Sequence, residues 1–252
     1  MANASIRNLR PLPLTTLCVF ACLVPAAVTA APVTLFGGLD HYAGALGQRT
    51  ESFVAGASAA AAIGDLTLAG MRYDDNRIGR GYGMIGGAGL PIGFSTILRV
   101  QATRFVGDDS FRAWRAKAGP QFGIPGGGSV ALSYSYYEDN LPSTSHGAIG
   151  ELATPVAGGL TGRMTASCAT SPQGPPALQG SVGLGWRPMP RLEISGEVGM
   201  TRNASGAAGQ PFPGQHGLAG IAPLGGAATP SSSDPSQEIA GTALIGIRVF
   251  LP

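Results

Sequence analysis

The sequence predicts an all-β protein: a transmembrane, antiparallel, up-and-down β-barrel of about twelve strands, with ten as the alternative count. Segments of about ten residues alternate between apolar and polar side chains, which is the period of strands that face lipid on one side. Charged residues make up only 12% of the chain, while glycines number 40. After residue 30 there is no apolar run long enough to form a spanning helix.

The first 30 residues have the pattern of a signal peptide that is removed on export. Two arginines precede an apolar run from Leu14 to Val24, and small residues from Val28 to Ala30 supply the expected cleavage point. The run is too short for a retained spanning helix. We therefore expect a cleaved signal peptide over residues 1–30 and a single barrel domain over residues 31–252.

Twelve candidate strands can be placed in order along the remaining chain. The alternation is clearest in the eleventh, where Leu192, Ile194 and Val198 oppose Glu193 and Glu197. The second, fourth and eighth strands are rich in glycine and alanine and give the weakest pattern. The predicted strands are Val33–Ala45, Glu51–Ile63, Leu66–Tyr73, Ile78–Leu90, Phe94–Phe105, Phe111–Gly123, Ser129–Tyr137, Gly147–Thr154, Leu160–Ala169, Leu178–Arg187, Leu192–Met200 and Glu238–Leu251.

The connections between these strands alternate in character. Short breakers such as Gly64-Asp65 and Pro125–Gly128 are followed by longer, more polar segments. Membrane barrels have short turns on the periplasmic side and longer loops outside. The longest connection, residues 203–237, is rich in Gly, Ala, Pro and Ser, and we expect a flexible outer loop there.

Charged residues on the strands predict what lines the interior. A base on the lipid face near the midplane costs about 2–4 kcal/mol, so we expect these side chains to point inward. They indicate a polar pore with a basic tilt; the alternative is that acid–base pairs fill and close a narrow lumen. The expected lumen-lining residues are Arg99, Arg115, Lys117, Arg163, Glu193, Glu197 and Arg248.

Two further groups lie near the predicted strand ends. The aromatic residues there favour an interfacial girdle over sugar-stacking platforms; they are Trp114, Trp186, Tyr82, Tyr134, Tyr136, Tyr137, Phe105 and Phe111. Acidic pairs predict acidic loops on the outer rim, made of Asp74, Asp75, Asp108, Asp109, Glu138 and Asp139. These loops are expected to be solvated; the alternative is that they hold divalent cations that bridge to lipid phosphates.

Several function classes are disfavoured. Beyond residue 30 the chain has as many bases as acids, which argues against nucleic-acid binding. Asp40 and His41 are neighbours on a strand and face opposite sides, so they cannot pair. The sequence shows no metal-ligand cluster, phosphate loop or nucleophile elbow. We therefore expect no enzyme activity, no catalytic residues, no metal site and no cofactor.

The leader, the alternating strands, the asymmetry of the connections and the final strand together resemble a Gram-negative bacterial outer-membrane β-barrel protein. The resemblance implies a location in the outer membrane, contact with membrane lipid and lipopolysaccharide, and insertion by the barrel-assembly machinery. Such barrels usually end on an aromatic residue, whereas here Phe250 is followed by Leu251 and Pro252.

The expected function is a narrow pore, or an export or uptake channel, for small or linear polar solutes. The alternative is a closed structural or adhesive barrel that acts through its outer loops, and an outer-membrane hydrolase is the least favoured hypothesis. The sequence predicts neither the solute nor the oligomeric state.

Overall fold

The structure, a computed structural model, describes residues 32–44, 49–61, 64–76, 79–140, 144–171, 174–202, 210–212, 224–226 and 239–251. The predicted signal peptide and most of the predicted loop at 203–237 lie outside these residues. Among the residues that are described, no helix is long and apolar enough to cross a membrane.

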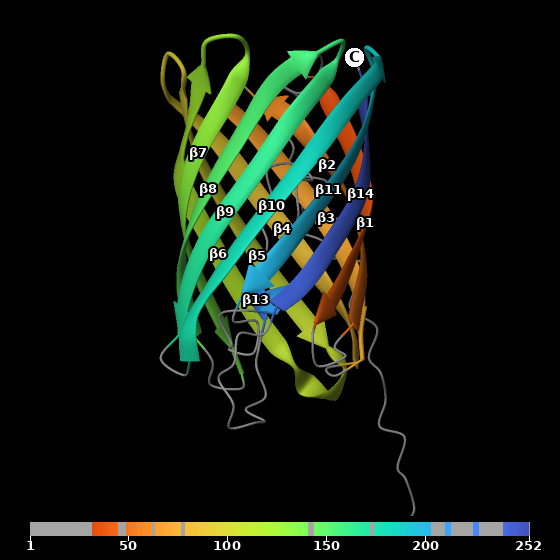
Figure 1. Ribbon diagram of the computed structural model, residues 1–252, viewed down its shortest axis with the longest axis vertical. Coiled ribbons are helices and arrows are strands. Elements are labelled where there is room, and N and C mark those ends of the chain that lie inside the picture. Colours follow the sequence, from red (N-terminus) through yellow and green to blue (C-terminus); the bar gives the residue numbers. More distant parts are fainter. Residues whose placement is uncertain are drawn as a thin grey trace, which may run out of the picture. The chain divides into compact units, whose positions relative to one another are not determined.

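Twelve strands form one closed antiparallel barrel, so the higher of the two predicted counts is confirmed (Figure 1). Each strand pairs with its neighbours in sequence, and the last strand closes the barrel by pairing with the first. The strands are β1 (Val33–Gly44), β2 (Arg49–Ala61), β3 (Gly64–Asp75), β4 (Gly79–Gly93), β5 (Thr96–Gly107), β6 (Arg112–Ile124), β7 (Gly128–Asp139), β8 (Thr144–Ala157), β9 (Leu160–Ser171), β10 (Gly174–Met189), β11 (Leu192–Arg202) and β14 (Ile239–Leu251). Closure leaves no strand edge unpaired, which is what a sheet in lipid requires.

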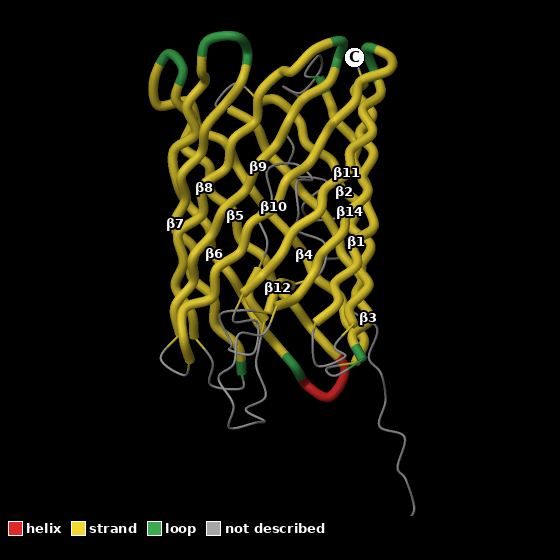
Figure 2. Tube along the Cα trace, in the orientation of Figure 1, coloured by secondary structure: helices red, strands yellow, loops and turns green. Residues whose placement is uncertain are grey.

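The short connections gather at one end of the barrel, here called the turn end, and the opposite end is called the loop end (Figure 2). Gly126-Gly127 and Gly158-Gly159 make two of the turns, with all four φ angles positive. That backbone region strains any residue with a Cβ atom, so glycine is needed there. At the loop end, the 3-10 helix η2 (Asp108–Ser110) connects β5 to β6. Two three-residue strands, β12 (Gln210–Phe212) and β13 (Leu224–Gly226), pair as a separate small sheet.

Side chains alternate between the two faces of the wall, apart from register shifts near the ends of some strands. Outward positions carry large apolar residues that are mostly solvent-exposed in the isolated chain, among them Leu39, Met84, Val198 and Ile245. An apolar exterior of this extent, all round a closed barrel, indicates contact with a membrane, because soluble monomers rarely expose apolar patches above a few hundred Å². The inward positions between them are small, polar or charged toward one end of the barrel, and many are aromatic or aliphatic toward the other.

An aromatic cluster covers the inner wall from β1 to β7 toward the loop end. Its buried members include Tyr73, Phe105 and Tyr137, and the rings of Tyr73 and Phe105 meet edge to face with centroids 6.4 Å apart. Gly81 and Gly83 on β4 make room, since a Cβ atom at either would lie within 3.0 Å of Tyr73 or Met71 atoms. Phe105, Phe111 and Tyr137 are therefore core residues, and their predicted place in the interfacial girdle is wrong.

Several strands extend beyond their predicted ends. β3 continues to Asp75 and β7 to Asp139, and both carboxylates turn inward. The Thr50 hydroxyl donates to Asp75, and the Tyr137 hydroxyl donates to Asp139 over 2.8 Å. Hydrogen bonding inside the barrel thus keeps these polar residues in the sheet, where the sequence pattern alone indicates a loop.

Candidate functional site

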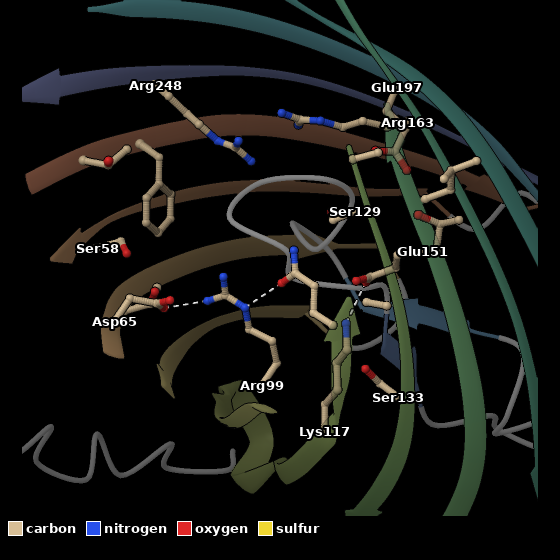
Figure 3. A pocket seen from close by; sticks show the side chains of 18 of the residues that line it. Ser58, Asp65, Arg99, Lys117, Ser129, Ser133, Glu151, Arg163, Glu197 and Arg248 are labelled. Carbon is tan, nitrogen blue, oxygen red and sulfur yellow. Dashed lines mark hydrogen bonds and ion pairs between the residues drawn. The ribbon is translucent and has the colours of Figure 1, made fainter. Parts of the chain in front are cut away.

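The polar part of the interior lies toward the turn end and contains a cavity of about 480 Å³. Arg99, Lys117, Arg163 and Arg248 extend into it from β5, β6, β9 and β14 (Figure 3). In the closed order of twelve strands, β6 and β14 are six places apart, so the bases face the cavity from opposite walls. Among the described residues, the acids that line the same cavity are Asp65, Glu151 and Glu197.

Arg99 on β5 reaches across β4 to β3. Its Nη1 donates to Asp65 Oδ1 over 2.5 Å, and its Nε donates to Gln121 Oε1 on β6 over 2.8 Å. In the register, Gly89 of β4 lies directly between Asp65 and Arg99. A Cβ atom on Gly89 would come within 2.5 Å of the Asp65 carboxylate and 2.8 Å of the guanidinium. The ion pair therefore depends on glycine at this position.

Lys117 on β6 crosses β7 in the same way to reach β8. Its Nζ lies 2.6 Å from Glu151 Oε1, and its side chain is only 7% exposed. The inward residues of β7 near this crossing, Ser133 and Ser135, are small and leave space for the lysine stem. Arg115, two residues earlier on the same face, is also buried.

Glu193 on β11 accepts from three arginines. Its Oε1 lies 2.5 Å from Arg163 Nη2 on β9 and 3.3 Å from Arg248 Nη1 on β14. Arg187 Nη2 lies 3.4 Å from the other oxygen, and the Arg187 guanidinium also stacks 4.4 Å from the centre of the Phe250 ring. Gly185 of β10 lies beneath the Arg163 pair, where a Cβ atom would be 3.3 Å from the carboxylate. Gly185 thus lies close to this pair, but a Cβ atom there would crowd the charged groups less than one at Gly89 would.

All seven residues predicted to line the lumen point to the interior face. Five of them border the cavity, namely Arg99, Lys117, Arg163, Glu197 and Arg248. Arg115 and Glu193 are buried but do not line this cavity among the described residues. Glu197 accepts a 2.5 Å hydrogen bond from the Ser181 hydroxyl, so it is held against the wall by β10.

Sequence reasoning missed three polar residues that position these bases: Asp65, Gln121 and Glu151. Asp65 sits where the pattern indicates a turn, and Glu151 lies on one of the weakest predicted strands. The pattern that could have revealed them is an inward-facing glycine with an acid opposite it on one neighbouring strand and a base opposite it on the other. That signal needs the register, which Gly89 shows only once the strands are paired.

The predicted acidic rim does not form one set of solvated loops. Asp75 and Asp139 are buried strand residues that face inward, so the prediction is wrong for these two. Asp74 is an exposed strand residue whose Oδ2 lies 2.8 Å from Arg80 Nε.

The remaining rim residues also differ from one another. Glu138 belongs to β7 and accepts from Trp114 Nε1 at 3.1 Å and from the Tyr136 hydroxyl at 3.0 Å. Asp108 is exposed in η2, and nothing of the Asp109 side chain is described. Within the described part of the chain, no three His, Cys, Asp or Glu residues gather closely enough to hold a metal ion.

The sequence matches no known family description and no curated protein. Its structure is similar to solved barrels. The KdgM porin in complex with disordered oligogalacturonate is 11% identical over 87% of this chain and 99% of the porin, with a TM-score of 0.58. The NanC porin is 10% identical over 88% of this chain and 100% of the NanC chain, with a TM-score of 0.57. An outer-membrane channel from Pseudomonas putida F1 is 7% identical over 90% and 99% of the two chains, with a TM-score of 0.56.

The fold is that of an outer-membrane β-barrel. At such low identities the likeness concerns the fold, and it agrees with the closed barrel and apolar exterior described above. The predicted fold class, the resemblance to outer-membrane barrels and the outer-membrane location are confirmed.

Proposed function

We propose that this barrel is a narrow channel for small or linear polar solutes, with a preference for anionic ones. The observation that carries the proposal is the cavity within the barrel, into which Arg99, Lys117, Arg163 and Arg248 project from separate strands. Charged rings in a low-dielectric surround decide which ions and polar groups enter a pore. Because the ion pairs hold the bases along the wall, they leave the space between the walls for a solute.

The comparison with the KdgM porin supports an extended anionic solute. That porin is described in complex with oligogalacturonate, a chain of sugars that each carry a carboxylate. Guanidinium groups bind carboxylates through paired hydrogen bonds, so arginines on opposite walls suit a chain with repeated carboxylates. A carboxylated sugar chain is therefore the first solute class to test.

The test is a planar-bilayer recording on the folded protein. Substituting glutamine for both Lys117 and Arg248 removes one base from each of two opposite walls. The reversal potential in a salt gradient should then move toward cation preference. Arg202→Gln is the matched control, since Arg202 faces outward and should leave selectivity unchanged. An unchanged reversal potential in a double variant that folds normally would reject these bases as the selectivity determinants.

A closed structural or adhesive barrel is the second candidate, and the buried aromatic cluster toward the loop end favours it. In such a barrel the same charges serve as interior ion pairs, and the outer loops do the work. Wild-type protein that folds but gives no conductance would support this candidate and reject the channel.

We retain the expectation that the barrel is not an enzyme. Of the three histidines, His41 and His146 lie on the outward face, away from the cavity, and His216 is outside the described residues. His146 is hydrogen-bonded to the Tyr134 hydroxyl. Assay of the folded protein with ester and amide substrates checks this expectation.

A further inference from the structure

Three arginines lie on the outward face near the loop end of adjacent strands. They are Arg72 on β3, Arg104 on β5 and Arg112 on β6, and all three are exposed. In the register, Arg72 lies opposite Tyr82 of β4, and Tyr82 lies opposite Val106 of β5. On its other side, Val106 lies opposite Arg112 of β6. The set therefore spans four neighbouring strands, or about 14 Å of the outer wall at the usual strand spacing.

No acidic side chain among the described residues pairs with these three arginines. The fourth outward arginine of this region, Arg80, is different because Asp74 neutralises it at 2.8 Å. A guanidinium that faces lipid needs either water or a counter-charge. Arg104 lies three residues from the end of β5, about 10 Å along the strand and less along the tilted strand's barrel axis. A position this near the strand end is closer to the headgroups than to the hydrocarbon centre.

Aromatic residues at the same height support this depth. Tyr82 and Trp114 face outward beside Arg72 and Arg104 and are 64% and 44% exposed. Such rings lie at the boundary between headgroups and hydrocarbon. The opposite wall lacks the cluster, because Arg202 is the single outward arginine among the described residues of β9, β10, β11 and β14. The basic face is thus local to one side of the barrel.

We propose that the outward face formed by Arg72, Arg104 and Arg112 is a binding site for a lipid headgroup with more than one phosphate, as carried by the glycolipid of the outer leaflet. Arginine binds phosphate through paired, charge-assisted hydrogen bonds. Three such groups spread over about 14 Å fit two separated phosphates better than the single phosphate of a glycerophospholipid. Tyr82 and Trp114 lie where the sugar and upper acyl chains of that lipid would pack.

The site is tested by native mass spectrometry of the folded barrel in detergent, titrated with diphosphoryl lipid A. The variant R72Q/R104Q/R112Q should bind at least about tenfold more weakly than wild type. The control R202Q removes an outward arginine from the other wall and should bind as wild type does. Unchanged binding by the triple variant, or an equal loss in R202Q, would overturn the proposal.

Two further arms test the chemistry of the site. Wild-type protein should prefer diphosphoryl lipid A to phosphatidylglycerol, and equal affinity for the two would count against a headgroup with several phosphates. Binding should persist in EDTA, since the arginines contact phosphate directly; loss of binding on chelation would instead favour cations held by the acidic residues. If the triple variant does not fold, Arg104→Gln and Arg104→Lys replace it. The glutamine variant should then bind more weakly than the lysine variant, and equal binding by the two and wild type would overturn the proposal.

Discussion

Glu193→Gln should destabilise the barrel more than any other single carboxylate-to-amide change among the described residues of the barrel interior. The Glu193 side chain is 7% exposed, and the two arginines that it holds most closely, Arg163 and Arg248, are each 16% exposed. Removing one partner of a buried pair costs about 3–5 kcal/mol. Because Arg187 is 47% exposed and solvent screens its charge, we expect the lower end, about 3 kcal/mol.

The assay is the urea dependence of folding into lipid vesicles, followed by the change in gel mobility between unheated and boiled samples. A loss of about 3 kcal/mol is a change of roughly 100-fold in the folding equilibrium. Glu51→Gln is the control, because the Glu51 side chain is 78% exposed and lies 3.8 Å from His41. If Glu193→Gln and Glu51→Gln shift the urea midpoint equally, the interior ion pairs do not stabilise the barrel.

Three other predictions concern packing, topology and location. Gly89→Val should displace the Asp65–Arg99 pair and cost about 1–3 kcal/mol in the same urea assay, whereas Gly70→Val, which has open space around it, should not; equal effects would refute the steric cause. Protease added to intact cells should cut within 203–237, and an epitope at Gly217 should be accessible there; access only after outer-membrane permeabilisation would reverse the orientation. The detergent-purified protein should be β-rich and heat-modifiable, and recovery only from the soluble periplasm would contradict a membrane barrel.

The barrel could be predicted from the sequence because lipid-facing and interior-facing side chains alternate at every second residue along a strand. In β11, Ile194 and Val198 face outward while Glu193 and Glu197 face inward, as the alternation indicates. The errors lie at the strand ends. Phe105 shares the parity of Arg99 and so faces inward, yet its position near a strand end favoured an interfacial role. At such positions, the alternation along the strand predicts the face of a side chain better than its distance from the strand end does.

The arrangement of the site could not be predicted in the same way. Parity placed Lys117 inside, but its partner Glu151 is two strands away and depends on the paired register. The inward turn of Asp75 and Asp139 depends on hydrogen bonds to Thr50 and Tyr137, which no local pattern encodes. Contacts between side chains on different strands follow from strand order and stagger, and composition does not specify them.

An ion pair that crosses an intervening strand also favours the correct register of the three strands involved. Asp65, Gly89 and Arg99 meet only when β3, β4 and β5 are all in their correct stagger. A slip of one residue would turn the arginine toward hydrocarbon and bring a side chain under the carboxylate. Misalignment of β3, β4 and β5 would thus carry an electrostatic penalty in addition to the loss of strand pairing. Gly89 therefore helps to fix the stagger of neighbouring strands in the barrel.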